Sequence, residues 1–446
     1  MLGFETSGNA TLTVFDDAPV LSTDPWVYGN PYFGSWSHHF KISNSQKANI
    51  SKSKYIWFSH GHPDHLDADS YDIFKNSIWL IPDHYGERIF LSLKERFDVI
   101  KIKSNEWFQV SQRVRIKSFA DWNQDAALLI DINGKDCICN ANDGSLLGWR
   151  SEIKKLISNY QNRFLLKLIN WGDADMINFY DESGNFIEPT QSKNEPLGLS
   201  YNYHMQKLNC NFAIPFSSFH QYSRIDSAHM NQFITPHEKH FEGFDTTRGT
   251  LLDSHGFWNS ENDSYTPSKK EKMTAVLAKP EEFGDNYSDE LSKDDFLALK
   301  KYFLQFSHLK KHLGCIKFVV GNKEYSIPIS NKKSLIKFEV PRNSLMKAIN
   351  YDIFDDLLIG NFMKTTLVNI KDLYPNFTPF VAKYGDNGCA RSSDELKSYF
   401  QYYKLNSSSF WTDFIRIKSE DKIRKMGLNN SRLIAPIRHI KRKIFH

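Results

Sequence analysis

The chain has 446 residues, 40% of them hydrophobic and 14% aromatic, and its 56 Lys and Arg nearly balance its 52 Asp and Glu. This composition excludes a disordered or fibrous chain and predicts one large globular domain with a smaller one. No run approaches the roughly 18 apolar residues of a membrane span, and the N-terminus lacks a signal-peptide pattern, so we expect a cytoplasmic protein with no membrane span. The five cysteines are scattered without a CxxC pair, so no disulfide framework and no cysteine-held metal site is predicted.

Short β-type runs separated by turn residues dominate the first third of the chain. The runs are "TLTVF", "YIWFS", "SIWLIP", "FDVIKIK", "RVRIKSF", "AALLIDI" and "DCICNAN". Between the last two, Asn133-Gly134 can adopt the positive φ angles of a tight turn, which predicts a hairpin.

Helical patterns follow the strands. "SEIKKLISNYQNRFLLKLI" (151–169) predicts one helix and "SYNYHMQKLN" (200–209) a shorter one, before the strand-like "FAIPFSSF". Strands mixed with helices predict a layered α/β domain over residues 1–245.

The second half of the chain divides by composition. Residues 246–290 are rich in Ser, Asn, Asp, Lys, Gly and Pro, which predicts a linker or a long surface excursion. Helical and strand patterns then alternate over residues 291–370, which predicts a small α+β domain, and residues 371–446 are expected to form a helical C-terminal region.

The stretch "YIWFSHGHPDHLD" places His60, His62, Asp64 and His65 directly after an apolar run. The run predicts a buried strand, so the four residues lie on the loop at its end, where side chains can converge. His60 and His62 are two residues apart and can share a metal, while Asp64 and His65 can face a second one. Imidazole with carboxylate suits zinc, iron or manganese, so we predict one or two divalent metal ions.

This HxHxDH loop resembles the defining motif of the metallo-β-lactamase superfamily. With "STDPWVYGNPYFGSW", "CNANDG" and "AIPFSSFH", residues 10–240 resemble the metallo-β-lactamase-type domain of CMP-N-acetylneuraminate hydroxylases and, more loosely, the UlaG-like metal-dependent hydrolases. The resemblance implies an αββα sandwich with a metal site in the cleft at its top, joined here to the smaller α+β domain.

The resemblance also implies further site residues. The metal-bridging aspartate of the family falls on Asp143, and the last histidine ligand falls on His220, with His229 as its rival. One family ligand has no histidine here; it lies within "ADWNQDAA", where Asp121, Asn123 or Asp125 can substitute, and a carboxylate there favours iron or manganese over zinc. Asp24 in "TDPW" matches a family position that we interpret either as structural, the reading we favour, or as supporting the ligands.

Three functions are compatible with such a site. The first is hydrolysis of a small polar substrate (a phosphoester, amide or lactone) by metal-activated water, with Asp64 and Asp143 as the catalytic carboxylates. The second is an iron-dependent monooxygenase acting on an N-acyl sugar nucleotide or a similar small molecule; because the chain lacks Rieske-type cysteine–histidine pairs, it would need electrons from a partner protein. The third is a binding protein that keeps the fold without the chemistry. No nucleic-acid partner is predicted.

Overall fold

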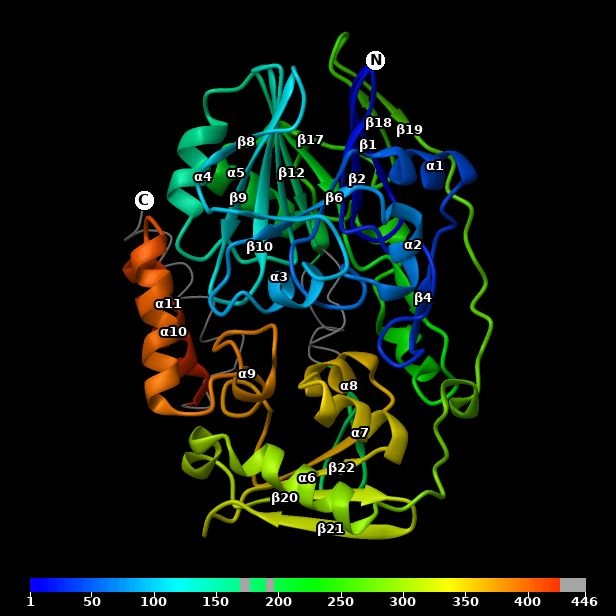
Figure 1. The fold of residues 1–446 in the computed structure, drawn as a ribbon, viewed down its shortest axis with the longest axis vertical. Coiled ribbons are helices and arrows are strands. Elements are labelled where there is room, and N and C mark those ends of the chain that lie inside the picture. Colours follow the sequence, from blue (N-terminus) through cyan, green and yellow to red (C-terminus); the bar gives the residue numbers. More distant parts are fainter. Residues whose placement is uncertain (169–176, 190–195, 426–446) are drawn as a thin grey trace.

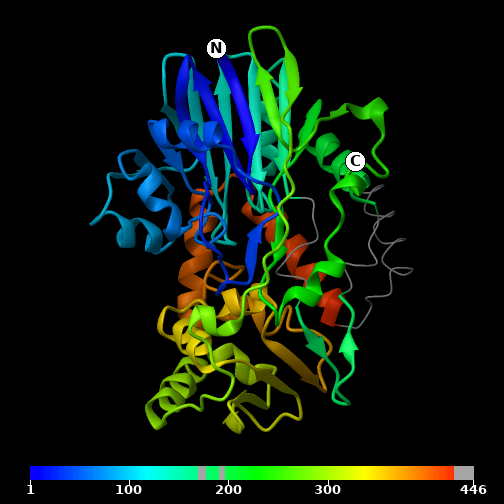
Figure 2. The same cartoon turned by 90° about the vertical axis from the view of Figure 1, so that its right-hand side faces the viewer.

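The computed structural model describes residues 1–168, 177–189 and 196–425. Two large sheets form its upper half, as Figures 1 and 2 show. The first has eight strands in the spatial order β19-β18-β1-β2-β3-β5-β6-β7. Their bounds are β1 (Leu2–Ser7), β2 (Thr11–Asp16), β3 (Ala18–Thr23), β5 (Tyr55–Trp57), β6 (Ile78–Pro82), β7 (Val99–Ile102), β18 (Gly256–Asn259) and β19 (Ser264–Pro267).

The second sheet has seven strands in the order β17-β15-β12-β11-β10-β9-β8. Their bounds are β8 (Trp107–Gln109), β9 (Val114–Ala120), β10 (Ala126–Ile132), β11 (Asp136–Asn142), β12 (Asn162–Lys167), β15 (Phe212–Pro215) and β17 (Thr250–Leu251). The hairpin predicted between β10 and β11 is confirmed, because Asn133 and Gly134 have φ angles of 54° and 68° and the two strands pair antiparallel.

The side chains of each strand alternate between two cores. On β10, Leu128 and Ile130 enter the core between the two sheets, whereas Ala127 and Leu129 face the helices that cover the second sheet. Those helices are α4 (Arg150–Ile157) and α5 (Leu197–Leu208). The outer face of the first sheet is covered by α1 (Asn44–Lys52), α2 (Tyr71–Phe74) and α3 (Arg88–Leu93). The layers therefore run helix, sheet, sheet, helix, and the αββα sandwich of the metallo-β-lactamase type is confirmed.

The helix predicted over 151–169 is wrong in its second half. Helix α4 ends at Ile157, and residues 162–167 form β12 between the parallel strands β11 and β15, whereas residue 169 lies outside the described residues. A parallel strand in the middle of a sheet is covered on both faces, so its sequence is apolar without alternation, and "RFLLKLI" resembles the continuation of a helix.

A third sheet forms the lower part of the molecule, in the order β14-β13-β23-β22-β20-β21. Its strands are β13 (Phe179–Tyr180), β14 (Phe186–Ile187), β20 (Cys315–Val320), β21 (Lys323–Pro328), β22 (Leu335–Glu339) and β23 (Lys364–Val368). Helices α6 (Lys293–Leu304), α7 (Arg342–Asn350) and α8 (Phe354–Gly360) share its hydrophobic core. We call this sheet and these helices the lower unit.

The two parts exchange strands. Residues 246–290, expected as a linker or surface excursion, contain β17, β18 and β19 of the sandwich sheets, and β13 and β14 from the first half of the chain extend the sheet of the lower unit. The division into the predicted domains stays a prediction.

The remaining elements are short or C-terminal. They are the strand pair β4 (Trp36–His38) and β16 (His220–Tyr222), the helices α9 (Thr378–Val381), α10 (Ser393–Asn406) and α11 (Phe410–Lys425), and 3-10 turns at Ala68–Ser70, Ala228–Phe233, His237–Lys239, Thr246–Arg248, Pro280–Phe283 and Ser307–Lys311. Within the described ranges, no helix has the length and apolar character needed to cross a bilayer.

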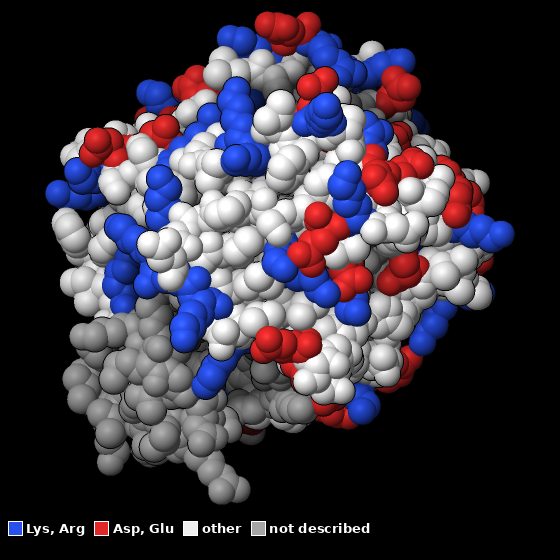
Figure 3. Space-filling view, turned by 90° about the horizontal axis from the view of Figure 1, so that it is seen from below, with Lys and Arg blue, Asp and Glu red and all other residues white. Residues whose placement is uncertain are grey.

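The face seen from below carries charges of both signs. Figure 3 shows Lys and Arg side chains interspersed with Asp and Glu over the coloured part of this face. A mixed surface of this kind is ordinary for a globular protein and differs from the single-sign patch that is typical of a nucleic-acid interface.

A buried ion pair joins the sandwich to the lower unit. Both the Arg224 and Asp285 side chains are 0% exposed, and an Arg224 guanidinium nitrogen lies 2.7 Å from Asp285 Oδ2. The same carboxylate accepts hydrogen bonds from the backbone N–H and the hydroxyl of Ser344 in the first turn of α7. The Arg224 guanidinium also lies 3.9 Å from the centroid of the Phe362 ring, just after α8. These contacts hold α7 and α8 against the sandwich.

We predict that Arg224→Met destabilises the chain strongly. Removing the guanidinium leaves the Asp285 carboxylate buried without its cation, which costs about 3–5 kcal/mol. The measurement is the melting temperature by calorimetry, compared with Arg248→Met, whose ion pair with Asp245 has side chains 46% and 42% exposed. That exposed pair is worth about 1 kcal/mol or less. Equal melting temperatures for the two variants would contradict the prediction.

Candidate metal centre

The HxHxDH loop follows β5, a central strand of the first sheet between the parallel strands β3 and β6. Loops at the carboxyl ends of parallel strands meet at one edge of a sheet. The backbone N–H of Ser59 donates to Asp24 Oδ1 at 2.7 Å, which anchors the start of the loop. The N–H groups of His65 and Leu66 both donate to the His62 carbonyl, at 3.0 and 2.8 Å, so the chain turns sharply and brings its histidines together.

Gly61 is required by a close approach of the C-terminal region. A Cβ atom at this position would lie 2.1 Å from the ring of Tyr384, far inside van der Waals contact. The same ring lies 5.7 Å from the His62 ring, measured between centroids. The loop is therefore covered by a residue more than 300 positions later in the chain.

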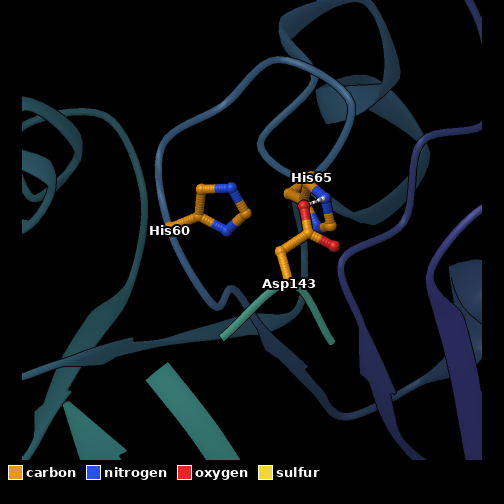
Figure 4. A group of neighbouring side chains, drawn as sticks. All are labelled: His60, His65 and Asp143. Atoms are coloured by element: carbon orange, nitrogen blue, oxygen red, sulfur yellow. Dashed lines mark ion pairs between the residues drawn. The ribbon is translucent and has the colours of Figure 1, made fainter. Parts of the chain in front are cut away.

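Three of the predicted residues form a compact group. One possible ligand atom from each of His60, His65 and Asp143 lies within 4.8 Å of the others. Figure 4 shows the two rings and the carboxylate converging from the loop and from the end of β11. His60 is 2% and His65 0% exposed, whereas the Asp143 side chain is 29% exposed and so borders solvent. A donor set of two imidazoles and one carboxylate suits zinc, iron or manganese.

Asp64 lies against the same histidine. Its Oδ2 is 3.1 Å from His65 Nε2, and Asp143 Oδ2 is 3.3 Å from that nitrogen. The Asn9 amide and the Tyr32 hydroxyl both donate to the Asp64 carboxylate, which fixes its orientation. Burial alone would raise the pKa of Asp64, but His65 outweighs burial and lowers it, so the carboxylate stays ionised.

Negative charge surrounds His65. Burial alone would lower the pKa of its imidazole, but the carboxylates of Asp64 and Asp143 outweigh burial and raise it well above its usual value. On the other side of the ring, His65 Nδ1 lies 3.4 Å from Asp24 Oδ2 and 2.9 Å from the Asn142 amide nitrogen. The group as a whole therefore favours a positive charge at the position of the ring nitrogens, from a proton or from a metal ion.

Of the three residues considered for the missing ligand, the structure brings Asp125 to the site. Its Oδ1 lies 3.5 Å from His60 Nδ1. Asp121 instead accepts hydrogen bonds from the backbone of Asn123 and Leu147, and Asn123 lines a neighbouring cavity. Burial, with Asp121 and Asp143 nearby, raises the pKa of Asp125 well above its usual value.

The two candidates for the last histidine lie in different places. His220 is buried and stacks on Trp36 with ring centroids 3.5 Å apart, and Asp64 and Asp143 are near enough to act on its charge. It does not join either group of potential ligands found among the described residues. His229 is hydrogen-bonded to Asn178 and packs on Phe186. Neither placement tests ligation, so the role of His220 stays a prediction.

A second group contains two residues that sequence reasoning missed. His62 lies with Asp355 and Asp356 of α8, again with potential ligand atoms within 4.8 Å of one another. His62 Nε2 is 3.3 Å from Asp355 Oδ2, and burial is outweighed by the two carboxylates, which raise the pKa of His62 to about 9. The available signal was the "FDDLLIG" segment, a helix apolar on all sides except for two adjacent acids.

Four residues at the centre have a strained backbone. Their φ angles lie in the left-handed region that residues other than glycine rarely adopt: 42° at Asp24, 55° at Tyr32, 44° at Asn142 and 68° at Ser217. Each of the four donates or accepts a hydrogen bond at the site. Strained residues of this kind persist where surrounding structure holds them, and they cluster at functional sites.

Comparisons with known proteins give resemblances at the level of fold. No protein-family model matches the chain, and no curated protein matches it in sequence. Among solved structures, an isothiocyanate hydrolase from Delia radicum gut bacteria is 12% identical, with 61% of this chain and 98% of that chain covered and a TM-score of 0.36. The metallo-β-lactamase fold protein YhfI from Bacillus subtilis is 12% identical, with 57% and 90% covered and a TM-score of 0.32.

A third similar structure is a single-residue mutant of CmlA beta-hydroxylase, at 12% identity and a TM-score of 0.33. The match covers 48% of this chain and 45% of that chain, so this chain spans less than half of the hydroxylase. The fold assignment rests on the sheets and helices described above.

We predict that Asp24→Asn weakens metal binding without unfolding the chain. The amide keeps the shape of Asp24 but loses the anionic acceptor beside His65, and loss of such a support typically costs about 10–100-fold in metal affinity. Competition for Zn²⁺ with a chromogenic chelator measures the affinity, and near-UV circular dichroism reports the fold. Asp17→Asn, at a side chain 76% exposed, is the control. Unchanged affinity would show that Asp24 only shapes the loop.

Proposed function

We propose that this protein is a metal-dependent hydrolase in which His60, His65 and Asp143 hold a divalent cation. The proposal is carried by the convergence of these three side chains at the edge where the strands of the sandwich end. The group of side chains around His60 and His65 fits a cation. It contains more carboxylates than imidazoles, and a buried carboxylate is costly without a positively charged partner.

A bound divalent cation lowers the pKa of water towards neutrality and polarises a carbonyl or phosphoryl oxygen. The residues of the chain hold the cation and orient the water. Ser217 Oγ donates to Asp143 Oδ1 at 2.8 Å, which leaves Oδ2 facing His65. Asp143 is the partly exposed carboxylate, so we assign it the orientation of the attacking water. Asp64 is 3% exposed and clamped by Asn9 and Tyr32, and we assign it the orientation of His65 and a share of the cation's charge.

A neighbouring cavity supports an anionic substrate. Its volume is about 350 Å³, within the usual range for small-molecule sites. Lys167 links its lining to the segment after Asp143, because Lys167 Nζ donates to the carbonyl of Gly144 at 3.0 Å. The charged residues of its lining are Arg150, Lys167, Lys207, Arg416 and Asp386. The excess of cationic groups favours a substrate that carries a phosphate or carboxylate beside the bond that is cleaved.

We predict that the metal-loaded protein hydrolyses members of a panel of anionic phosphoesters, lactones and amides, and that Asp143→Asn lowers kcat by about 100-fold or more. Chelation should abolish the activity, and added Mn²⁺ or Zn²⁺ should restore it in the wild type but not in the variant. Initial rates across the panel provide the measurement.

The control for this experiment is Asp72→Asn, at a side chain 93% exposed, which should keep the wild-type rate. A wild-type protein that binds metal tightly but cleaves nothing would overturn the hydrolase and favour the non-catalytic binding protein.

Asp125 favours a second candidate function. A carboxylate in place of a histidine beside His60 gives a harder donor set, which suits iron or manganese. Iron there would permit hydroxylation of a small substrate by dioxygen, in which one oxygen atom enters the substrate and the other is reduced to water by two electrons from a partner protein and two protons. A visible absorption band in protein purified with bound iron supports this candidate, whereas colourless protein supports hydrolysis.

We predict that Asp125→His shifts metal preference towards zinc. Replacing the carboxylate by an imidazole softens the donor set, so the affinity for Zn²⁺ relative to Mn²⁺ should rise by about tenfold. Parallel titrations of both metals into the chelator-treated protein measure the ratio. An unchanged ratio would show that Asp125 does not contact the metal.

A further inference from the structure

The second group of side chains is built from two distant parts of the chain. His62 comes from the loop after β5, and Asp355 and Asp356 come from the first turn of α8 in the lower unit. The His62 and Asp355 side chains meet across 293 positions of sequence. The metal loop of the sandwich is therefore in direct contact with an acidic pair that lies outside the αββα layers.

Both carboxylates are withdrawn from water. Asp355 is 4% and Asp356 6% exposed. Asp355 has partners, because its Oδ1 accepts from the backbone N–H of Lys383 at 3.3 Å and its Oδ2 faces His62. Within the described part of the chain, Asp356 Oδ1 is buried with no hydrogen-bond partner. A buried carboxylate oxygen without a partner is costly, and it points to a ligand.

The single imidazole of His62 cannot provide partners for both Asp355 and Asp356. His62 turns Nε2 towards Asp355, and its Nδ1 lies 2.8 Å from His60 Nε2. Both nitrogens of His62 are thus engaged, while two adjacent carboxylates face the same small volume. Burial and then Asp355 raise the pKa of Asp356 well above its usual value, as expected for like charges held together out of water.

We propose that His62, Asp355 and Asp356 bind a second divalent cation, so that the lower unit completes a two-metal centre. One imidazole and two carboxylates are a donor set suited to manganese, iron or zinc. Tetrahedral ligands about 2.1 Å from one ion are about 3.4 Å apart; the three donor atoms lie within 4.8 Å of one another, and His62 Nε2 is already 3.3 Å from Asp355 Oδ2. The proposal deepens the proposed function and rests on it for the first cation, held by His60, His65 and Asp143.

The neighbouring histidines bring the two groups of candidate ligands together. The His60 and His62 rings are in contact, with centroids 4.7 Å apart, so the two groups would hold their cations side by side. Paired cations can stabilise the attacking and the leaving oxygen of one displacement. The second cation would thereby favour phosphoester substrates among the classes considered above.

The test counts metal ions in full-length protein. Chelator-treated wild type is loaded with Mn²⁺ alone, desalted and measured by mass spectrometry of the metal. We expect about two equivalents in the wild type and about one in Asp356→Asn and in Asp355→Asn. The matched control is Asp352→Asn, just before α8, whose side chain is 39% exposed and pairs with Arg391. This control should keep both equivalents.

Melting temperatures supply a readout that does not depend on activity. In chelator, Asp356→Asn should melt at or above the wild-type temperature, because the amide removes the repulsion between two adjacent buried carboxyl groups. Mn²⁺ should raise the melting temperature of the wild type more than that of the variant, because the variant has lost one of the binding sites that stabilise the folded state. If the carboxylates instead serve only as an ion pair for a protonated His62, the variant melts lower by the same amount with and without Mn²⁺, and the proposal fails.

The two proposals fail in distinguishable ways. Suppose that the wild type binds one equivalent of Mn²⁺. If Asp143→Asn abolishes this binding and Asp356→Asn does not, the second cation is overturned and the proposed function stands. If Asp356→Asn abolishes this binding and Asp143→Asn does not, the first cation and the function proposed for it are overturned. Protein that binds no Mn²⁺ would overturn both.

Discussion

The structure around the HxHxDH loop depends on an excess of buried negative charge. Asp24, Asp64 and Asp143 converge on the single imidazole of His65, and Asp125 lies beside His60. Carboxylates held close together away from water repel one another, and either a proton or a cation can compensate for the lost hydration. A proton on His65 compensates for part of that charge. A divalent ion would compensate for more of it, and would explain why the clamps on Asp64 and the strained backbone around it are all directed at the same small volume.

The two sheets hold the loop ends, and with them the carboxylates, in fixed positions. The candidate ligands come from three stretches: the loop after β5 carries His60 and His65, Asp143 directly follows β11, and Asp125 directly precedes β10. These stretches are held by paired strands with a shared apolar core, so the carboxylates cannot relax away from one another without breaking sheet contacts. Asn142 illustrates the coupling, because its amide nitrogen lies within hydrogen-bonding distance of Asp24, Ser59 and His65. The end of β11 therefore sets the geometry of the loop after β5.

The fold and half of the centre could be predicted from the sequence, for identifiable reasons. Period-two patterns and the Asn-Gly turn are local, and the "HGHPDH" run is compact, so a short window contains the whole signal. A helix was predicted where β12 lies because a parallel strand that is covered on both faces lacks the alternation of apolar and polar residues that distinguishes other strands from helices. Asp355 and Asp356 could not be placed, since their neighbour His62 is 293 positions away from Asp355 and no local pattern encodes that contact. Likewise, the choice among Asp121, Asn123 and Asp125 required the turn geometry, because all three lie within five residues of one another.

The position of α8 makes metal binding and the packing of the lower unit thermodynamically linked. Arg224, Asp285 and Phe362 hold α7 and α8 against the sandwich, on the side where Asp355 meets His62. A ligand that binds between His62 and the α8 carboxylates stabilises this packing. By linkage, the packing strengthens the binding of that ligand by the same free energy. Tyr384, which closes over Gly61, belongs to the same cover. Asp143, with its side chain 29% exposed, lies on the part of the centre that this cover leaves open to solvent.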